Sequence, residues 1–273
     1  MTLLMEARSI LYLWERCSLY IGAYPVSSPI TQGSVSFLVG IDGPITIEQS
    51  CTEKRVCANS FLIPAGVTFA IDCHGNRLAN CYLDPCSEDF FRLKQIMDEH
   101  VESIFVGNSK EFLQAAAFEK ILCQSLSYRE AEHLLEFAAF PTRIQAPKRV
   151  EVDVRIIDVI NIIKNDPTVN LSIKTLAKRV NVSEVTLQRL FKATTGVSIR
   201  RFRLWHRLFV TAIKLTHGCS ITEAAVSAGF SDAPHFNHAV KSMLGMTPSS
   251  IIQLTQNMTI VSGGKPLTVN ELR

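Results

Sequence analysis

One pattern of residues occurs twice in the second half of the chain, at an offset of 48 to 49 residues, and it limits the possible folds more than any other feature. The first copy covers residues 171–198 and the second covers residues 219–248. Each copy contains a short amphipathic segment, a tight turn and a second helical segment that ends at a glycine. This order is typical of a helix-turn-helix unit, so we predict two such units.

The residues at each turn support this interpretation. Ser183 is suited to cap the second helix of the first unit, because its hydroxyl can accept a hydrogen bond from a free backbone amide. In the second unit, Gly229 tolerates a left-handed turn and Ser231 is the expected cap. Pro234 follows in the first helical turn, where its missing N–H costs little. Both second helices are therefore predicted to begin at defined residues.

The outward faces of the two second helices carry the candidate DNA-binding residues. Glutamine and arginine can form bidentate contacts with adenine and guanine edges in the major groove. The candidates are Val185, Gln188, Arg189 and Lys192 in the first unit, and Ala233, His235, Asn237, His238 and Lys241 in the second.

A long helix is predicted between the units, because residues 199–216 contain neither glycine nor proline. About 18 residues at 1.5 Å each give a helix near 27 Å long. Such a helix can place two units in successive major grooves, about 34 Å apart. Its arginines are expected to contact phosphates, so that affinity falls with salt.

Residues 150–253 resemble the DNA-binding domain of the AraC/XylS family of bacterial transcription regulators. The residues that carry the resemblance are Gly229, Phe230, Ser231, Asp232, Phe236, Lys241, Gly245, Thr247 and Pro248. The resemblance implies base contacts from three residues of the first unit (Val185, Gln188 and Arg189) and four of the second (Ala233, His235, Asn237 and His238). Many relatives carry arginine where this chain has His238, so the second unit is expected to read bases weakly or to contact mainly phosphate.

The charge distribution divides the chain in the same place. Residues 148–253 contain 15 Lys and Arg against 7 Asp and Glu, whereas residues 1–147 contain 11 against 17. A basic half and an acidic half are expected when only one of them meets a polyanion. We therefore predict three segments: an effector and dimerisation domain (1–147), a DNA-binding domain (148–255) and a C-terminal tail (256–273).

The first half is predicted to be a small β-barrel followed by helices. Six short β-prone runs separated by turn residues lie between residues 18 and 83, and helical patterns follow over 87–106, 110–125 and 127–140. The runs around Pro64 and Pro85 resemble the cupin-like sensor half of AraC-type regulators. The predicted fold is thus α+β with two domains: a cupin-like β-barrel with helices, then an all-α domain with two helix-turn-helix units joined by a long helix.

The sequence suggests neither an enzyme nor a cofactor site. It has no glycine-rich phosphate loop and no Gly-x-Ser-x-Gly or His-Glu-x-x-His motif. His74 is the only histidine in the barrel region, so no metal site is expected there. Cys73, Cys81 and Cys86 lie within 14 residues, but small buried side chains are the simpler role for them than redox sensing.

Three functional hypotheses remain from the sequence alone. The first is a DNA-binding transcription activator controlled by a small effector in the N-terminal barrel, which should then contain a pocket. The second is a regulator controlled by a protein partner or by dimerisation alone, with a filled barrel. The third is a nucleic-acid-binding protein without regulatory output, or a bifunctional enzyme. The expected partners are promoter DNA, RNA polymerase and a second copy of the chain.

The expected location is the cytoplasm. No segment has 18 uncharged apolar residues, and the first residues lack a basic region followed by an apolar stretch. We therefore expect no association with a membrane.

Overall fold

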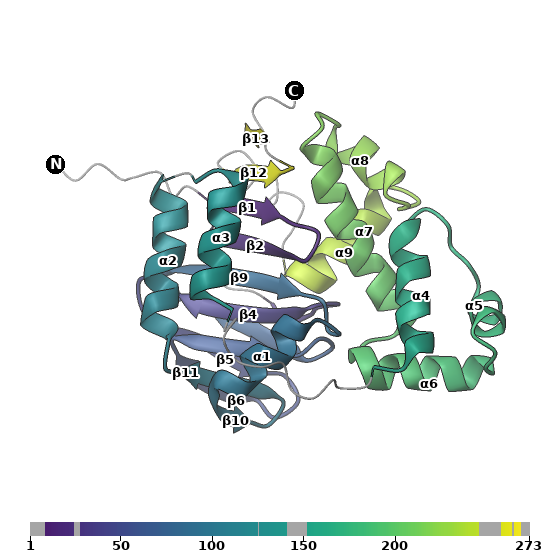
Figure 1. The fold of residues 1–273 in the computed structure, drawn as a ribbon, viewed down its shortest axis with the longest axis horizontal. Coiled ribbons are helices and arrows are strands. Elements are labelled where there is room, and N and C mark those ends of the chain that lie inside the picture. The colour runs from purple at the N-terminus through teal and green to yellow at the C-terminus, as the bar shows by residue number, and fades with distance from the viewer. Residues whose placement is uncertain are drawn as a thin grey trace.

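The structure is a computed structural model that describes residues 9–24, 28–124, 126–140, 152–245, 258–263 and 265–268. It has a sheet-rich N-terminal part and a helical C-terminal part that lie against each other (Figure 1). The predicted boundary between 147 and 148 lies outside the described residues, as do Thr247 and Pro248 of the family pattern.

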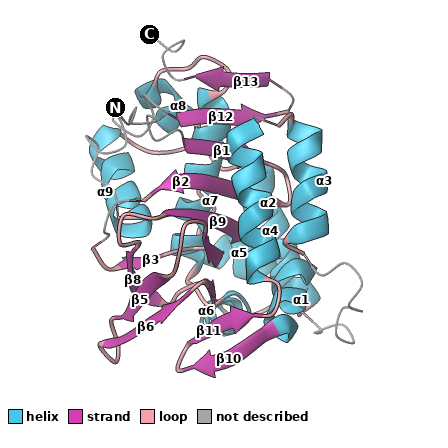
Figure 2. Ribbon diagram, turned by 90° about the vertical axis from the view of Figure 1, so that its left-hand side faces the viewer, coloured by secondary structure: helices cyan, strands magenta, loops and turns pink. Residues whose placement is uncertain are grey.

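In the described residues nine strands form the larger sheet, in the order β10-β11-β7-β4-β9-β2-β1-β12-β13. Figure 2 shows β9, β2, β1, β12 and β13 one after another in this sheet. Two of them, β12 and β13, follow the helical part in sequence, and no pattern in the sequence predicted them. The strands are β1 (Ser9–Leu13), β2 (Cys17–Ala23), β4 (Val35–Gly40), β7 (Ser60–Ile63), β9 (Arg77–Leu83), β10 (Met97–Val101), β11 (Ile104–Asn108), β12 (Met258–Ser262) and β13 (Lys265–Thr268).

A second sheet of four strands faces part of the first. Its order is β3-β8-β5-β6, with β3 (Ile30–Thr31), β8 (Thr68–Asp72), β5 (Ile45–Gln49) and β6 (Lys54–Ala58). Side chains from both sheets, including Leu38 and Phe61 from one and Ile47 and Phe69 from the other, fill the space between them. In the described residues the N-terminal part is therefore a two-sheet sandwich with a packed interior, a sheet-rich cupin-like arrangement in which the predicted barrel is not closed.

Three helices cover the opposite face of the larger sheet: α1 (Glu88–Ile96), α2 (Glu111–Gln124) and α3 (Tyr128–Ala138) (Figure 1). Strand β4 shows why the sheet lies between two layers. Phe37 faces the helices and Leu38 faces the second sheet, and both are fully buried. A strand buried on both faces is apolar almost throughout, as β4 is.

The predicted helix over residues 87–106 is wrong beyond Ile96. Residues 97–108 form the hairpin β10–β11, and β11 pairs with β7 through Phe105 and Val106. Glu102 has a φ of +57°, a left-handed conformation that a continuing helix excludes. Pairing with the edge of β7 and burial of Ile104 between the sheets outweigh the helical pattern of the sequence.

The C-terminal part contains six helices in the described residues: α4 (Val154–Asn165), α5 (Ile173–Arg179), α6 (Glu184–Thr195), α7 (Ile199–Leu215), α8 (Ile221–Ser227) and α9 (Ala233–Leu244). Helices α5 and α6 form the first helix-turn-helix unit (the first head), and α8 and α9 form the second head. Ser183 caps α6 as predicted. Asp232, not Ser231, caps α9, because its carboxylate accepts the hydrogen bond from the amide of His235.

Helix α7 holds the two parts together. It packs on the inner face of the larger sheet beyond the smaller one, where the Trp205 ring lies 5.3 Å from that of Tyr82. The guanidinium of Arg201 donates to the carbonyl of Thr31. A Cβ at Gly33 would lie 2.4 Å from that of Trp205, so only glycine permits this approach. The predicted linker between the heads is thus also part of the domain interface.

The first head meets the N-terminal part at two facing glycines. Gly196 ends α6 with a φ of +78°, and a Cβ there would lie 2.3 Å from the carbonyl oxygen of Ala65. A Cβ at Gly66 would lie 2.2 Å from the carbonyl oxygen of Gly196. Both backbones therefore touch without intervening side chains.

We expect Gly196→Ala to destabilise the chain more than Gly218→Ala. Both glycines have a positive φ, so each substitution costs about 1–2 kcal/mol of backbone strain. Nothing lies within 4 Å of a Cβ at Gly218, whereas the one at Gly196 meets Ala65. Thermal unfolding of both variants measures the difference, since 1 kcal/mol corresponds to a Tm change of about 2–4 °C. Equal losses would show that the glycine contact does not form in solution.

Candidate nucleic-acid interface

The first head presents one apolar and one polar face on α6. Leu187 and Phe191 are fully buried in the core that α4, α5 and α6 share. Gln188, Arg189 and Lys192 are exposed, and Val185 is 77% exposed despite its apolar side chain. An exposed valine beside glutamine and arginine offers both apolar and hydrogen-bonding contacts to base edges. All four predicted residues of the first head therefore lie on one accessible surface.

Two shallow grooves connect this surface with the second head. The first is lined by Gln188, Arg189 and Lys192 together with Ser198 and Arg200. The second is lined by Ser198 and Arg200 together with His235 and His238 of α9. The grooves share the start of α7, so Arg200, which is exposed, lies between the two predicted reading surfaces. In the sequence, Arg200 is only one of several arginines spaced along residues 199–216, and no other pattern indicates that it lies between the two surfaces.

The second head exposes fewer of its predicted residues. His238 and Lys241 are exposed, whereas Ala233 and Asn237 are half-buried. His235 already has partners, since its Nδ1 lies 3.1 Å from the Ser231 hydroxyl and its ring lies 5.3 Å from that of Phe230. The free side chains of this head are therefore a histidine and a lysine, with an amide beside them.

Most arginines of α7 are structural, which corrects the expectation that they contact phosphates. Arg203 donates to Asn170 Oδ1 at 2.9 Å and to the carbonyl of Leu171 at 2.6 Å. Arg207 is buried and its Nε donates to the carbonyl of Pro167 at 3.0 Å. Burial lowers the pKa of both guanidinium groups below their ordinary value.

Arg207 also joins the two heads. A Cβ at Gly229 would lie 2.6 Å from the carbonyl oxygen of Pro167 and 3.0 Å from Arg207 Nε. The turn of the second head therefore packs directly on the loop between α4 and α5, with the Arg207 side chain in the contact. This explains the glycine at position 229 by lack of space as well as by its φ of +96°.

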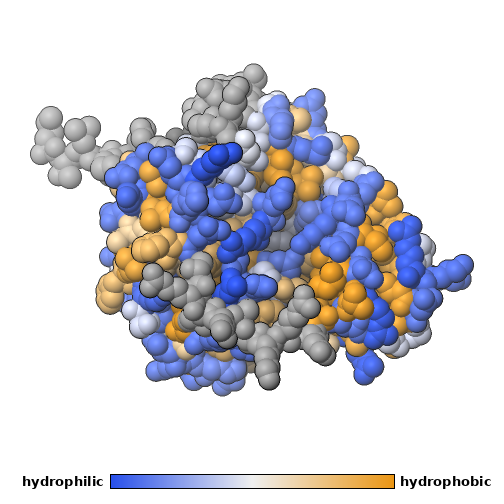
Figure 3. Space-filling model, in the orientation of Figure 1, coloured by the Kyte–Doolittle hydropathy of each residue, from blue (hydrophilic) through white to orange (hydrophobic). Residues whose placement is uncertain are grey.

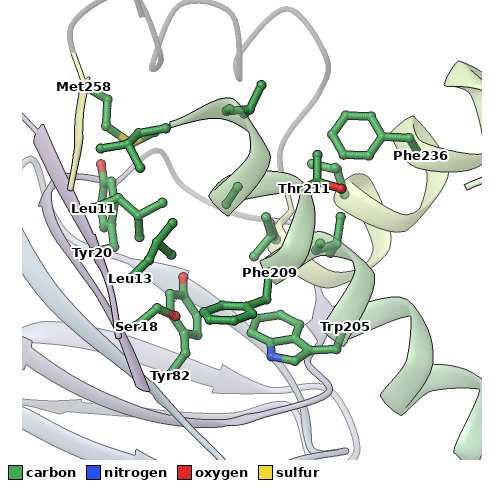
Figure 4. A pocket seen from close by; sticks show the side chains of 16 residues that line it. Leu11, Leu13, Ser18, Tyr20, Tyr82, Trp205, Phe209, Thr211, Phe236 and Met258 are labelled. Atoms are coloured by element: carbon green, nitrogen blue, oxygen red, sulfur yellow. The ribbon is translucent and has the colours of Figure 1, made fainter. Parts of the chain in front are cut away.

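A cavity of about 170 Å³ lies between the two parts of the chain (Figure 4). Its walls are almost wholly apolar, and neither lysine nor arginine lines it. One wall comes from the sheet and the other from α7 and α9. The lining residues are Leu11, Leu13, Ser18, Tyr20, Tyr82, Trp205, Leu208, Phe209, Thr211, Ala212, Leu215, Phe236, Val240, Leu244, Met258 and Ile260.

The three neighbouring cysteines of the sequence do not meet. Cys81 faces the helices of the N-terminal part, whereas Cys73 faces the second sheet, and Cys86 lies near α4. Burial raises the pKa of the Cys73 and Cys86 thiols to about 12, so they are protonated at neutral pH. Among the described residues, no group of three His, Cys, Asp or Glu side chains could hold a metal ion. Nor is any described helix long and apolar enough to cross a membrane.

Comparison with known proteins gives the helical part a family. Residues 176–253 match the family described as "Helix-turn-helix domain". The chain is 33% identical over 89 residues to the Msm operon regulatory protein of Streptococcus mutans, covering 32% of each protein. It is 32% identical over 108 residues to the HTH-type transcriptional regulator RipA of Corynebacterium glutamicum, covering 40% of this chain and 32% of that protein. These matches span about a third of the length of those relatives.

The whole fold is similar to that of ToxT from Vibrio cholerae. A structure of ToxT with bound unsaturated fatty acid superposes with a TM-score of 0.58 at 12% identity, over 89% of this chain and 96% of that one. The architecture of a sheet-rich part followed by two helix-turn-helix units is therefore shared from end to end. The fold and the two heads define a two-domain helix-turn-helix protein. Over the matched residues, these findings confirm that the second half resembles the DNA-binding domain of the AraC/XylS family.

We expect Arg207→Ala to reduce the stability of the fold and Arg200→Ala to weaken DNA binding. Loss of the buried charged hydrogen bond to Pro167 costs about 1.5–3 kcal/mol, so Arg207→Ala lowers the Tm. Arg200→Ala leaves the Tm nearly unchanged, because exposed substitutions usually alter stability by less than about 0.5 kcal/mol. It instead weakens DNA binding and reduces the slope of log K against log salt by about 1. An unchanged slope for Arg200→Ala would place that side chain away from phosphate.

Proposed function

We propose that the chain is a sequence-specific, double-stranded DNA-binding transcription regulator whose two heads read successive major grooves. The observation that carries the proposal is the single surface formed by α6, Arg200 and α9. Helix α7 has 17 residues, a length of about 26 Å at 1.5 Å per residue. That length suits heads that must enter the duplex about one turn apart.

We assign the DNA contacts of each head from the chemistry and the exposure of its side chains. Arg189 is the proposed guanine reader and Gln188 the adenine reader, while Val185 meets a thymine methyl group. Lys192 and Arg200 contact phosphates on either side of the first groove. In the second head the proposed base contacts come from residues 233, 237 and 238, and Lys241 contacts phosphate. His235, which is engaged by Ser231, is assigned a smaller part in reading bases.

The test of this function is selection of binding sites from random duplex DNA with the full chain. Two motifs about 10 base pairs apart are expected, with the stronger preference in the motif read by α6. A single motif would mean that the second head contacts only phosphate. Absence of any enriched sequence would contradict a sequence-specific regulator.

Arg189→Ala is expected to weaken binding to the selected site by about 1–3 kcal/mol and to relax the preference at one base position. The reason is loss of a bidentate contact to guanine. Lys192→Ala is the matched control on the same helix face, and it should weaken binding equally for all sequences. Binding measured on the selected site and on its single-base variants separates the two effects. If Arg189→Ala also acts equally on all sequences, Arg189 contacts phosphate.

We further propose that a small effector controls the regulator from the cavity between the two parts. The effector was expected inside the N-terminal barrel, but the interior of the sandwich is filled by side chains such as Phe61 and Phe69. The cavity beside α7 is apolar and lies between sheet and heads, so an occupant there contacts both (Figure 4). Its size suits a small apolar molecule, since cavities near 150 Å³ accept benzene. The fatty acid bound by ToxT is consistent with an apolar class of ligand.

Ala212→Phe is expected to abolish binding of such a molecule, because the larger side chain fills the cavity that Ala212 lines. The probe is indole, a neutral planar molecule, and the readout is the rise in Tm that binding to the folded chain produces. Ala116→Phe, on the exposed face of α2, is the control for the added ring. No rise in Tm with indole for the unmodified chain would favour the second hypothesis, control by a protein partner or by dimerisation alone.

Dimerisation is proposed to use the end of the α2–α3 hairpin. The two helices run antiparallel, so the first residues of α2 and the last of α3 lie together (Figure 1). Phe112 and Phe137 are 77% and 75% exposed there, with Leu113 beside them. Figure 3 shows apolar surface over α2 on this side of the molecule. Phe118, Ile121 and Leu135 of the same helices are buried on the sheet, so the hairpin has both an inner and an outer apolar face.

The remaining assignments follow from the family resemblance alone. They are activation of transcription, contact with RNA polymerase and a cytoplasmic location.

A further inference from the structure

The chain returns to its N-terminal sheet after the second head. Strand β12 pairs in parallel with β1, with Leu11 opposite Ile260 and Tyr12 opposite Val261. Strand β13 then pairs antiparallel with β12. We call the described residues 258–263 and 265–268 the strap. Because β1 pairs with β2 on its other side, the strap occupies what is otherwise the free edge of the sheet.

Strand β12 of the strap is buried on both of its faces. Val261 is 3% exposed and joins the core under α2 and α3. Ile260 is 2% exposed and packs with Leu13 of the sheet, Leu215 of α7 and Ala224 of α8. The strap therefore ties the first helix of the second head to the N-terminal sheet.

The same strand forms one wall of the cavity. Met258 and Ile260 line it beside Leu11, opposite Thr211 and Phe236 (Figure 4). An occupant of the cavity therefore contacts the strap and the helices of the second head at once.

We propose that the strap is a detachable strand that holds the second head against the N-terminal sheet, and that its release frees this head to take its place on DNA. The expected change in DNA affinity rests on the proposed function, whereas the expected change in hydrogen exchange rests only on the contacts of Ile260. While the strap is paired, the second head is fixed at α8 by Ile260 and at the end of α9, where the Tyr24 hydroxyl donates to the Leu244 carbonyl at 2.8 Å. Release removes the first of these restraints.

The first experiment uses the full chain with Ile260→Asp, which places a charge in the contact with α7 and α8. Ser262→Asp, on the same strand but half-buried, is the matched control. Amide hydrogen exchange is expected to be at least tenfold faster in α8 of the Ile260→Asp chain, and unchanged in α5. Its affinity for the selected two-motif site is expected to rise at least tenfold. Wild-type exchange rates in α8 would overturn the strap as a restraint on this head.

The second experiment locks the strap and compares two redox states of one variant, so that any loss of stability from the substitutions is common to both states. Leu11→Cys with Ile260→Cys places two thiols directly opposite each other, and oxidised glutathione can oxidise them to a disulfide while it is itself reduced. The oxidised protein is expected to bind the two-motif site at least tenfold more weakly than the same protein after reduction. The unmodified chain, treated identically, controls for its eight natural cysteines.

The outcomes separate the two proposals. Equal DNA affinity of the oxidised and reduced double-cysteine protein, with the disulfide verified by mass, would overturn the role of strap release in DNA binding. If no form of the chain binds any duplex, the proposed function fails, and hydrogen exchange in α8 alone decides whether the strap restrains this head.

Discussion

The packing of α7 on the larger sheet is the contact on which the rest of the architecture depends. One side of this helix carries Trp205 and Phe209 against the sheet, and another holds the heads together through Arg203 and Arg207. A rigid connection between the heads and a large domain interface are thus provided by the same 17 residues. Any change at the sheet that moves α7 also moves the first turn of α7, where Arg200 lies between the reading surfaces.

This arrangement explains why an apolar cavity is found at the interface and not inside the sandwich. The two sheets pack closely where large apolar side chains such as Leu38, Ile47 and Phe69 face one another. The helix meets the sheet at a less regular surface, where aromatic rings from both sides meet at 5.3 Å without filling the space. Incomplete packing at a boundary between two parts costs less than a void within one core, because each part keeps its own core.

The helical half could be read from the sequence because its information is local. The signals are the repeat, the turn glycine, the helix caps and the apolar spacing, and each copy of them lies within a short segment. Helices α5 to α9 form where these signals predict them. The predicted cap at Ser231 is wrong for a local reason as well, because Asp232, one residue later, accepts the capping hydrogen bond instead. The direction of the α7 arginines could not be predicted, because helical spacing does not show that Asn170, Leu171 and Pro167 supply the carbonyl and amide oxygens they bind.

The N-terminal half was harder because its structure depends on distant pairing. The pattern over 97–106 is compatible with a helix, and only the exposed edge of β7 makes it a hairpin. The sequence pattern over residues 55–63 predicts one strand, whereas the structure has two, β6 and β7. The change of sheet between Ala58 and Ser60 has no strong turn signal. The return of residues 258–262 to β1 joins positions about 250 apart, and no local pattern specifies such a partner.

That return also fixes an order of events during synthesis. The N-terminal sheet begins to fold first, as the chain leaves the ribosome, yet β1 lacks its neighbour β12 until residues 258–262 have been made. The DNA-binding helices are complete before the sheet that carries them. A newborn chain therefore passes through a stage in which both heads exist while this edge of β1 is open, and the domain arrangement of the structure forms only after β12 has been translated.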